Sequence, residues 1–179
     1  MDIVRTLLVH GAAVHVKDMM GQTALVWAAR GGHADVIHVL LASGATVDEA
    51  DQIGNTALLW ATIMGAADVV ELLLASGAAS NAPGGDGKTA LMEAVEKGHT
   101  ALVQLLLDRT ADVNVQDRFG RTALMWAVQR RDLTLVQVLL DRGAEVNATS
   151  SFGDTALRWA IEKGDTEIAR LLEEAGAQE

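Results

Sequence analysis

Apolar and polar residues are arranged along the chain in a pattern that recurs at a fixed distance. Five segments share the order Gly-x-Thr-Ala-Leu, and their threonines lie 33 residues apart: Thr23, Thr56, Thr89, Thr122 and Thr155. A short apolar stretch follows each Thr, and Thr is a good N-cap because its hydroxyl accepts a hydrogen bond from a free backbone N–H. The pattern therefore predicts a short helix after each threonine, such as 24–30.

A second helix is predicted in every repeat. If positions are numbered from Asp18, apolar residues stand at positions 19, 20, 23 and 24, as in Val36, Ile37, Leu40 and Leu41. This spacing makes one apolar face on a helix. Gly at position 15 is expected to end the first helix, and Gly at position 27 the second. The units are then 18–50, 51–83, 84–116, 117–149 and 150–179, with residues 1–17 as the second half of a unit.

Helices of about eight to ten residues cannot enclose a core alone, so their apolar faces must pack against the next unit. The same position accordingly carries the same residue in successive units. One ladder is Leu25, Leu58, Leu91, Leu124 and Leu157, and another is Ala28, Ala61, Ala94, Ala127 and Ala160. We therefore expect one all-α array over residues 1–179, a solenoid of stacked helix–turn–helix units.

Composition narrows the possible functions. The chain has 50% hydrophobic residues, no Tyr, two Phe and one Pro, which favours helices over a large β-sandwich. A net charge of −10 argues against binding to nucleic acid. Cysteine is absent, which excludes disulfides and cysteine-based zinc sites. With no apolar stretch near the roughly 20 residues of a membrane span and no signal-peptide pattern, we expect no membrane contact and a cytoplasmic location.

The repeat resembles the ankyrin repeat. The residues that carry the resemblance are the Gly-Arg-Thr-Ala-Leu-Met-Trp-Ala of 120–127 and the Leu-Leu-Asp-Arg-Gly-Ala-Glu-Val-Asn-Ala of 139–148, and the likeness extends over the whole chain. The resemblance implies a curved stack whose short β-hairpin loops and first helices line a concave, protein-binding surface.

Two departures from the ankyrin pattern are expected to have local effects. Thr-Pro-Leu-His is replaced by Thr-Ala-Leu-x in every unit, so the polar network associated with that His should be absent. Thr110 and Arg131 occupy glycine positions where φ is expected to be positive, at a cost of roughly 1 kcal/mol each. The unit 117–149 should therefore open most easily.

Two patterns resemble ligand-binding motifs, one for a phosphate and one for a metal ion, but neither has the sequence context that such a site needs. The segment 82–89 satisfies a relaxed phosphate-loop motif ending in Lys88 and Thr89, but no apolar strand precedes it and it lies in the same register as the loops of other units. The five histidines lack the spacing of metal ligands on one helix face. We therefore expect no cofactor, no metal and no enzymatic activity.

A row of tryptophans occupies position 10 of the first helices: Trp27, Trp60, Trp126 and Trp159, with Glu93 in the middle unit. Such a row most often packs between units, and a buried row is the favoured interpretation. An exposed aromatic binding surface is the alternative.

By resemblance, the contact residues lie at positions 2, 3, 5, 13 and 14. The first two units are apolar there, and the last two carry Arg beside Phe, a combination enriched at interfaces. The candidate protein-binding residues are Met19, Met20, Ile53, Ile63, Met64, Arg118, Phe119, Arg121, Arg130 and Phe152.

The leading hypothesis is a protein–protein interaction module whose basic end binds an acidic segment of its partner. The alternative is an engineered or reconstructed scaffold, or a fragment, with no dedicated partner. Such a chain could be monomeric or could associate weakly with itself through residues 1–17, where Ile3, Val4, Leu7 and Leu8 lack a covering helix.

Overall fold

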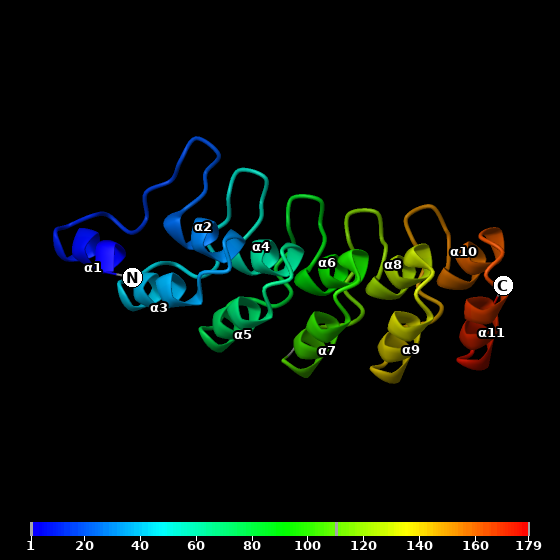
Figure 1. Cartoon of the computed structure of the whole chain (residues 1–179). Coiled ribbons are helices and arrows are strands. Elements are labelled where there is room, and N and C mark those ends of the chain that lie inside the picture. Colours follow the sequence, from blue (N-terminus) through cyan, green and yellow to red (C-terminus); the bar gives the residue numbers. More distant parts are fainter. Residues whose placement is uncertain (1, 110, 179) are drawn as a thin grey trace.

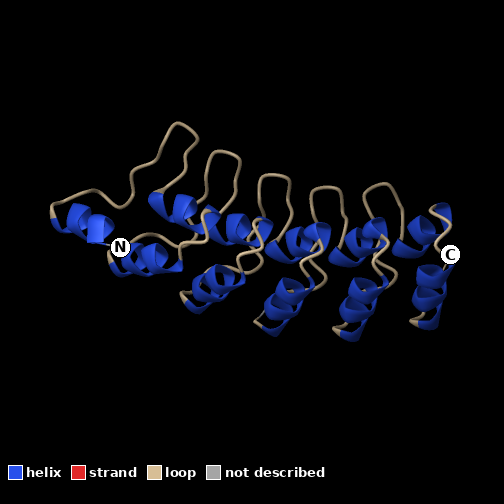
Figure 2. Cartoon of the chain, in the orientation of Figure 1, coloured by secondary structure: helices blue, strands red, loops and turns tan. Residues whose placement is uncertain are grey.

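The computed structural model describes residues 2–109 and 111–178, and these form helices and loops arranged in two layers (Figures 1 and 2). The first layer contains α2 (Ala24–Arg30), α4 (Ala57–Ile63), α6 (Ala90–Lys97), α8 (Ala123–Arg130) and α10 (Ala156–Glu162). The second layer contains α1 (Asp2–Val9), α3 (Ala34–Ala42), α5 (Ala67–Ala75), α7 (Thr100–Asp108), α9 (Leu133–Asp141) and α11 (Thr166–Glu174). The expected all-α solenoid is confirmed.

The repeated threonines start the first-layer helices, as predicted. Thr23 is the N-cap of α2, and its hydroxyl accepts the backbone N–H of Val26 at 3.3 Å. The threonines that precede α4, α6, α8 and α10 make the same bond to the residue three positions on. Because each cap satisfies a free N–H at the helix start, helices of only seven or eight residues begin at the same place in every unit.

The predicted left-handed residue follows each first-layer helix. Gly98 has φ of 75°, and Arg131 has φ of 60° at the equivalent place, the one positive value of a non-glycine residue in the described chain. The expectation for Arg131 is therefore confirmed, whereas Thr110 lies outside the described residues. The glycines at position 27, such as Gly44 with φ of 89°, end the second-layer helices in the same conformation.

The core lies between the layers and between successive units. Both ladders predicted from the sequence are buried, with no leucine of the first and no alanine of the second more than 4% exposed. In the second layer, position 23 is also buried in the five units from residue 18 onward, whereas the leucines at position 24, such as Leu41, are only half-buried and Glu173 at the same position is exposed. Position 24 therefore flanks the core, because its side chain lies at the edge of the apolar face.

The loops above the first layer form a row of hairpin-like turns (Figure 1). Within a loop, the position 1 N–H donates to the position 5 carbonyl, as from Asp51 to Asn55 at 3.0 Å. Neighbouring loops are also bonded, as from the N–H of Gln52 to the carbonyl of Met20 at 3.0 Å. No strand forms among the described residues (Figure 2), so these hairpins consist of turns only.

Candidate interaction surface

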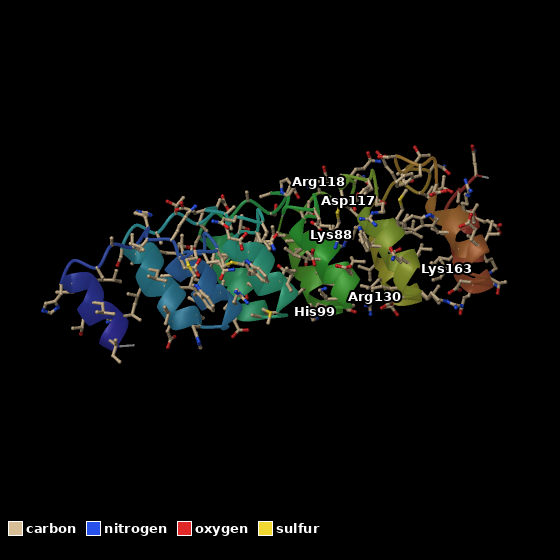
Figure 3. All side chains as sticks on the ribbon, turned by 90° about the horizontal axis from the view of Figure 1, so that it is seen from above. Lys88, His99, Asp117, Arg118, Arg130 and Lys163 are labelled. Carbon is tan, nitrogen blue, oxygen red and sulfur yellow. The ribbon has the colours of Figure 1, made fainter. Side chains whose placement is uncertain are left out.

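We use the name contact face for the loop tips and first-layer helix ends at positions 2, 3, 5, 13 and 14 of each unit. The face follows the row of loops along the whole array, and Figure 3 shows its charged residues from Lys88 in the central unit to Lys163 near the C-terminal end. Because each unit repeats the same backbone, the side chains at these positions determine how one part of the face differs from another.

The N-terminal part of the contact face is apolar and exposed, as expected from the sequence. Met19 is 93% exposed, Met20 61%, Ile53 56% and Met64 55%. Ile63 differs, because it is half-buried at the end of α4. Flexible methionine side chains adapt to irregular partner surfaces, so this part of the face has the composition of an adaptable binding surface.

An arginine is held between two tryptophans beside these methionines. The guanidinium carbon of Arg30 lies 4.9 Å from the ring centroid of Trp27 and 4.5 Å from that of Trp60. The indole N–H of Trp27 donates to Asp18 at 2.9 Å, and that of Trp60 donates to Asp51 at 2.8 Å. The stacked cation and the anchored indoles hold the three side chains in one arrangement.

The central unit replaces the tryptophan by Glu93 and has a buried cation beside it. The ammonium of Lys88 lies 2.9 Å from a carboxylate oxygen of Glu96, 3.0 Å from one of Asp86 and 3.6 Å from one of Glu93. Although burial opposes it, hydrogen bonds to Glu96 and Asp86 raise the pKa of Lys88. This ammonium is surrounded by carboxylates, which argues against the phosphate-loop interpretation because a phosphate would be repelled there.

Burial has the opposite effect on the nearest carboxylate. The Glu93 side chain is buried, and this desolvation raises the pKa of its carboxyl group above the ordinary value, although the charge of Lys88 acts against the shift. Beside this cluster, a hollow of about 690 Å³ lies among the loop tips of units two to four, and Glu93, Ile53 and Phe119 are among its lining residues. Gly85, at the tip of the central loop, also lines the hollow.

A second cation cluster occupies the fourth unit. Arg121 donates from Nε to Asp117 at 2.8 Å, and its guanidinium carbon lies 4.1 Å from the ring centroid of Trp126 and 4.9 Å from that of Phe119. On the other side, the ammonium of Lys88 lies 4.6 Å from the Trp126 centroid. Trp126 is therefore packed between two cations from neighbouring loops and is only 6% exposed.

The remaining predicted residues of the basic end lie near this cluster. Phe119 and Phe152 stack at 6.4 Å between ring centroids and are 46% and 73% exposed. Arg118 is exposed at the loop tip, and Arg130 reaches back to donate to the carbonyl of Glu96 at 2.7 Å. The structure thus brings the two phenylalanines together with Arg121, while Arg130 points toward the preceding unit.

The favoured interpretation of the tryptophan row, a buried row, is wrong for most of its members. Trp126 is buried, but Trp27 is 53% exposed, and Trp60 and Trp159 are half-buried. Position 10 lies at the border between the core and the contact face, and an indole becomes buried there only where cations from two loops cover it. The pairing of Trp at position 10 with a cation at position 5 is a signal that could have been read from the sequence.

The histidines lie apart, and within residues 2–109 and 111–178 no three potential metal ligands gather into a site. His33 and His99 precede α3 and α7 as N-caps without a side-chain capping bond. The ring of His99 instead lies against Gly65 of the preceding unit, 3.1 Å from where a Cβ would stand. His99 therefore packs at a unit junction, whereas the ring of His33 is exposed and lies beside Gly31 of its own unit.

Almost the whole chain matches a known family of repeat proteins. Residues 1–84, 51–117 and 91–178 each match a family model that describes three copies of the ankyrin repeat. The chain belongs to the ankyrin repeat family. Ankyrin repeats are in general protein–protein interaction modules, and the two-layer array above has that architecture. A search among curated proteins gave no match to the chain. Within the described ranges, every helix is too short or too polar to cross a bilayer.

Proposed function

We propose that this ankyrin array binds a protein partner through its contact face and carries out no reaction itself. The observation that carries the proposal is the state of its cations. Among the described residues, five cations have no carboxylate within 4.0 Å: Arg5 on α1, and Arg30, Arg118, Arg130 and Lys163, which all lie on the contact face. Most cations away from this face, such as Arg109 with Glu71 and Arg142 with Asp108, are paired.

The charges and the apolar side chains favour a partner with two features. The unpaired Arg118, Arg130 and Lys163 at the C-terminal end favour an acidic segment, because complementary charge speeds encounter and fixes register. The exposed Met19, Met20, Ile53 and Met64 at the other end favour an apolar segment that buries them. The stacked Phe119 and Phe152 lie at the basic end, where aromatic side chains beside arginine are typical interface anchors.

The proposal is tested by capture of the partner. The full chain is immobilised, the proteins it retains are identified by mass spectrometry, and one of them is prepared pure for a titration. The double variant Phe119→Ala with Phe152→Ala is expected to weaken this complex by about tenfold or more, the range of an interface anchor. The control is Gln137→Ala, an exposed residue of the second layer. Equal affinities of the double variant and the control would refute a contact-face interface.

A second candidate role is self-association through the N-terminal end. On α1, Ile3 is 76% exposed and Leu7 is 56% exposed, and Val9 at the helix end is 83% exposed. A second copy that covered these side chains would remove apolar area from water. Sedimentation of the chain and of the variant Ile3→Lys with Leu7→Lys tests this role. A dimer that the variant abolishes supports it, and a monomer at all concentrations rules it out.

A further inference from the structure

A second hollow lies on the contact face between α8 and α10. Its volume is about 460 Å³, and its lining residues are Arg121, Gln129, Trp159, Glu162 and Lys163. The one carboxylate among them, that of Glu162, is engaged by Nε of Arg158 at 3.0 Å. The ammonium of Lys163 meets no carboxylate among the described residues, so the hollow has an unused positive charge.

Arg121, which lines this hollow, lies over the ring of the buried Trp126, and the indole N–H of Trp126 has no hydrogen-bond partner in the described part of the chain. The equivalent tryptophans of the first two units do have one, since Trp27 donates to Asp18 and Trp60 to Asp51. In the fourth unit the equivalent carboxylate oxygen of Asp117 accepts from Nε of Arg121 instead. Arginine has therefore taken the acceptor that tryptophan uses elsewhere in the same array.

The second unit shows that this carboxylate does not need an arginine. Asp51 is buried, and one of its oxygens accepts two backbone N–H groups of its own loop. Its other oxygen accepts the indole N–H of Trp60 at 2.8 Å and the side-chain amide of Gln22 at 3.4 Å, and no guanidinium donates to it. Asp117 accepts the two backbone N–H groups of its loop in the same way. If Arg121 moved away, the indole of Trp126 could satisfy Asp117 as Trp60 satisfies Asp51.

We propose that the hollow between α8 and α10 receives an acidic side chain of the protein partner, and that Arg121 leaves Asp117 to meet it while Trp126 takes its place. The proposal rests on the binding function proposed above and names one subsite of it. Arg121 and Lys163 would hold the two carboxylate oxygens from opposite sides of the hollow. Removing Arg121 from Asp117 leaves no buried group unpaired, because the indole N–H gains the bond that the guanidinium gives up.

The negative charge of the whole chain does not oppose this step strongly. The net charge is −10, but charges more than about 10 Å away are screened at ordinary salt concentration. Close to the hollow, Arg158 pairs with both Glu162 and Asp154, and the ammonium of Lys163 is the lining cation without a carboxylate partner among the described residues. An incoming carboxylate therefore meets an unpaired ammonium.

The test uses the four indole N–H signals of the full chain in nitrogen-15 NMR, assigned with Trp→Phe variants. The probe is the peptide acetyl-Gly-Glu-Glu-Glu-Gly-amide, and its matched control carries Gln in place of Glu. The acidic peptide is expected to shift the Trp126 signal downfield, to slow its hydrogen exchange and to move the signal of Trp159. The signals of Trp27 and Trp60 should stay in place, and the Gln peptide should have no effect.

Two variants sharpen the result. Lys163→Met should weaken peptide binding by about tenfold or more, the range of one charge-assisted hydrogen bond. Lys97→Met, at the same position of the third unit and outside the hollow, is the control and should bind the peptide as the parent chain does. In Arg121→Leu the Trp126 signal should move downfield without any peptide, because the Asp117 oxygen that accepted from Arg121 then has the indole as its replacement donor. Arg121→Gln serves the same purpose if the leucine variant does not fold.

Several outcomes would overturn the proposal. These are the absence of any shift at millimolar acidic peptide, equal effects of the Gln peptide, and binding that moves Trp159 but leaves Trp126 unchanged. An unshifted Trp126 signal in the folded Arg121 variants would also overturn the exchange. If the Phe119 and Phe152 double variant loses the partner while Lys163→Met keeps full affinity, the proposed subsite is wrong but the proposed binding function stands. If neither variant changes partner capture, the proposed binding function fails.

Discussion

Arg131 adopts the left-handed backbone conformation that Gly98 adopts one repeat earlier, with φ of 60° against 75°. The conformation is needed at this place because the chain must turn from the first-layer helix into the second. A side chain with a Cβ has a strained backbone there, whereas glycine has not. The ion pair between Nε of Arg131 and Asp165, at 3.1 Å, connects the strained residue to the next unit.

The first prediction separates this strain from the ion pair. Arg131→Ala loses the pair and keeps the Cβ, whereas Arg131→Gly loses both. The glycine variant is therefore expected to have a free energy of unfolding about 1 kcal/mol higher than the alanine variant, measured by urea denaturation. The pair is exposed, so its own loss should cost about 1 kcal/mol or less. Equal stabilities of the two variants would contradict the assigned strain.

The same variants test whether unit 117–149 opens first. If strain at Arg131 lowers the stability of this unit, amides of α8 and α9 should exchange faster than those of α4 and α5 in the parent chain. Arg131→Gly should slow exchange in α8 and α9 and leave α4 and α5 unchanged. Uniform exchange rates along the array would show that the strain at Arg131 does not lower the local stability of unit 117–149.

The second prediction concerns the close approach of two loop tips. A Cβ on Gly85 would lie 1.7 Å from the carbonyl oxygen of Ile53, so the loops of units two and three must separate if one is added. Gly85→Ala is expected to lower the free energy of unfolding by about 1–3 kcal/mol, the range of overpacking. Gln52→Ala, at the same position one unit earlier, already has a Cβ and serves as the control. A Gly85→Ala variant as stable as this control would show that the two loop tips separate without a measurable cost in the free energy of unfolding.

How far the sequence predicts the structure depends on whether a feature repeats. The helix starts and the leucine and alanine ladders recur in every unit, so a single pattern predicts them all, and even the left-handed Arg131 follows from the register. The burial of Trp126 depends on Lys88 and Arg121, which the neighbouring units do not repeat. The same is true of the hollow beside Gly85, because residues that differ from unit to unit line it. Such features come from differences between units and from three-dimensional contacts.

The third prediction follows from the raised pKa of Glu93. Because burial raises the pKa above the ordinary 4.5, the folded state binds this proton more tightly than the unfolded state does. The contribution of Glu93 to stability is therefore fully present below pH 4.5 and is lost as the pH rises through the folded-state pKa. The pKa of Asp86 is lowered, because hydrogen bonds from Lys88 outweigh its burial. Its contribution to stability is therefore present above pH 3.8 and is lost as the pH falls through the folded-state pKa.

Glu93→Gln tests this sign. The variant stays neutral at every pH, so its stability relative to the parent chain should increase between pH 4.5 and pH 7. A difference of about 1 kcal/mol would raise the melting temperature by roughly 2–4 °C in a chain of this size. Glu96→Gln is the control, since it removes a carboxylate that also contacts Lys88. A stability difference that decreases over this pH range would show that the attraction of Lys88 outweighs burial.

The fourth prediction distinguishes the tryptophans by their access to solvent. Trp27 is 53% exposed and Trp126 is 6% exposed, so a small neutral quencher such as acrylamide reaches the first and not the second. Trp27→Phe should lower the fraction of fluorescence that acrylamide quenches, and Trp126→Phe should raise it. Circular dichroism checks that both variants keep their helices, because Trp126 packs against Lys88 and Arg121. If both substitutions changed the quenched fraction in the same direction, the two indoles would not differ in their exposure to solvent. The statement that cations from two loops cover Trp126 would then be wrong.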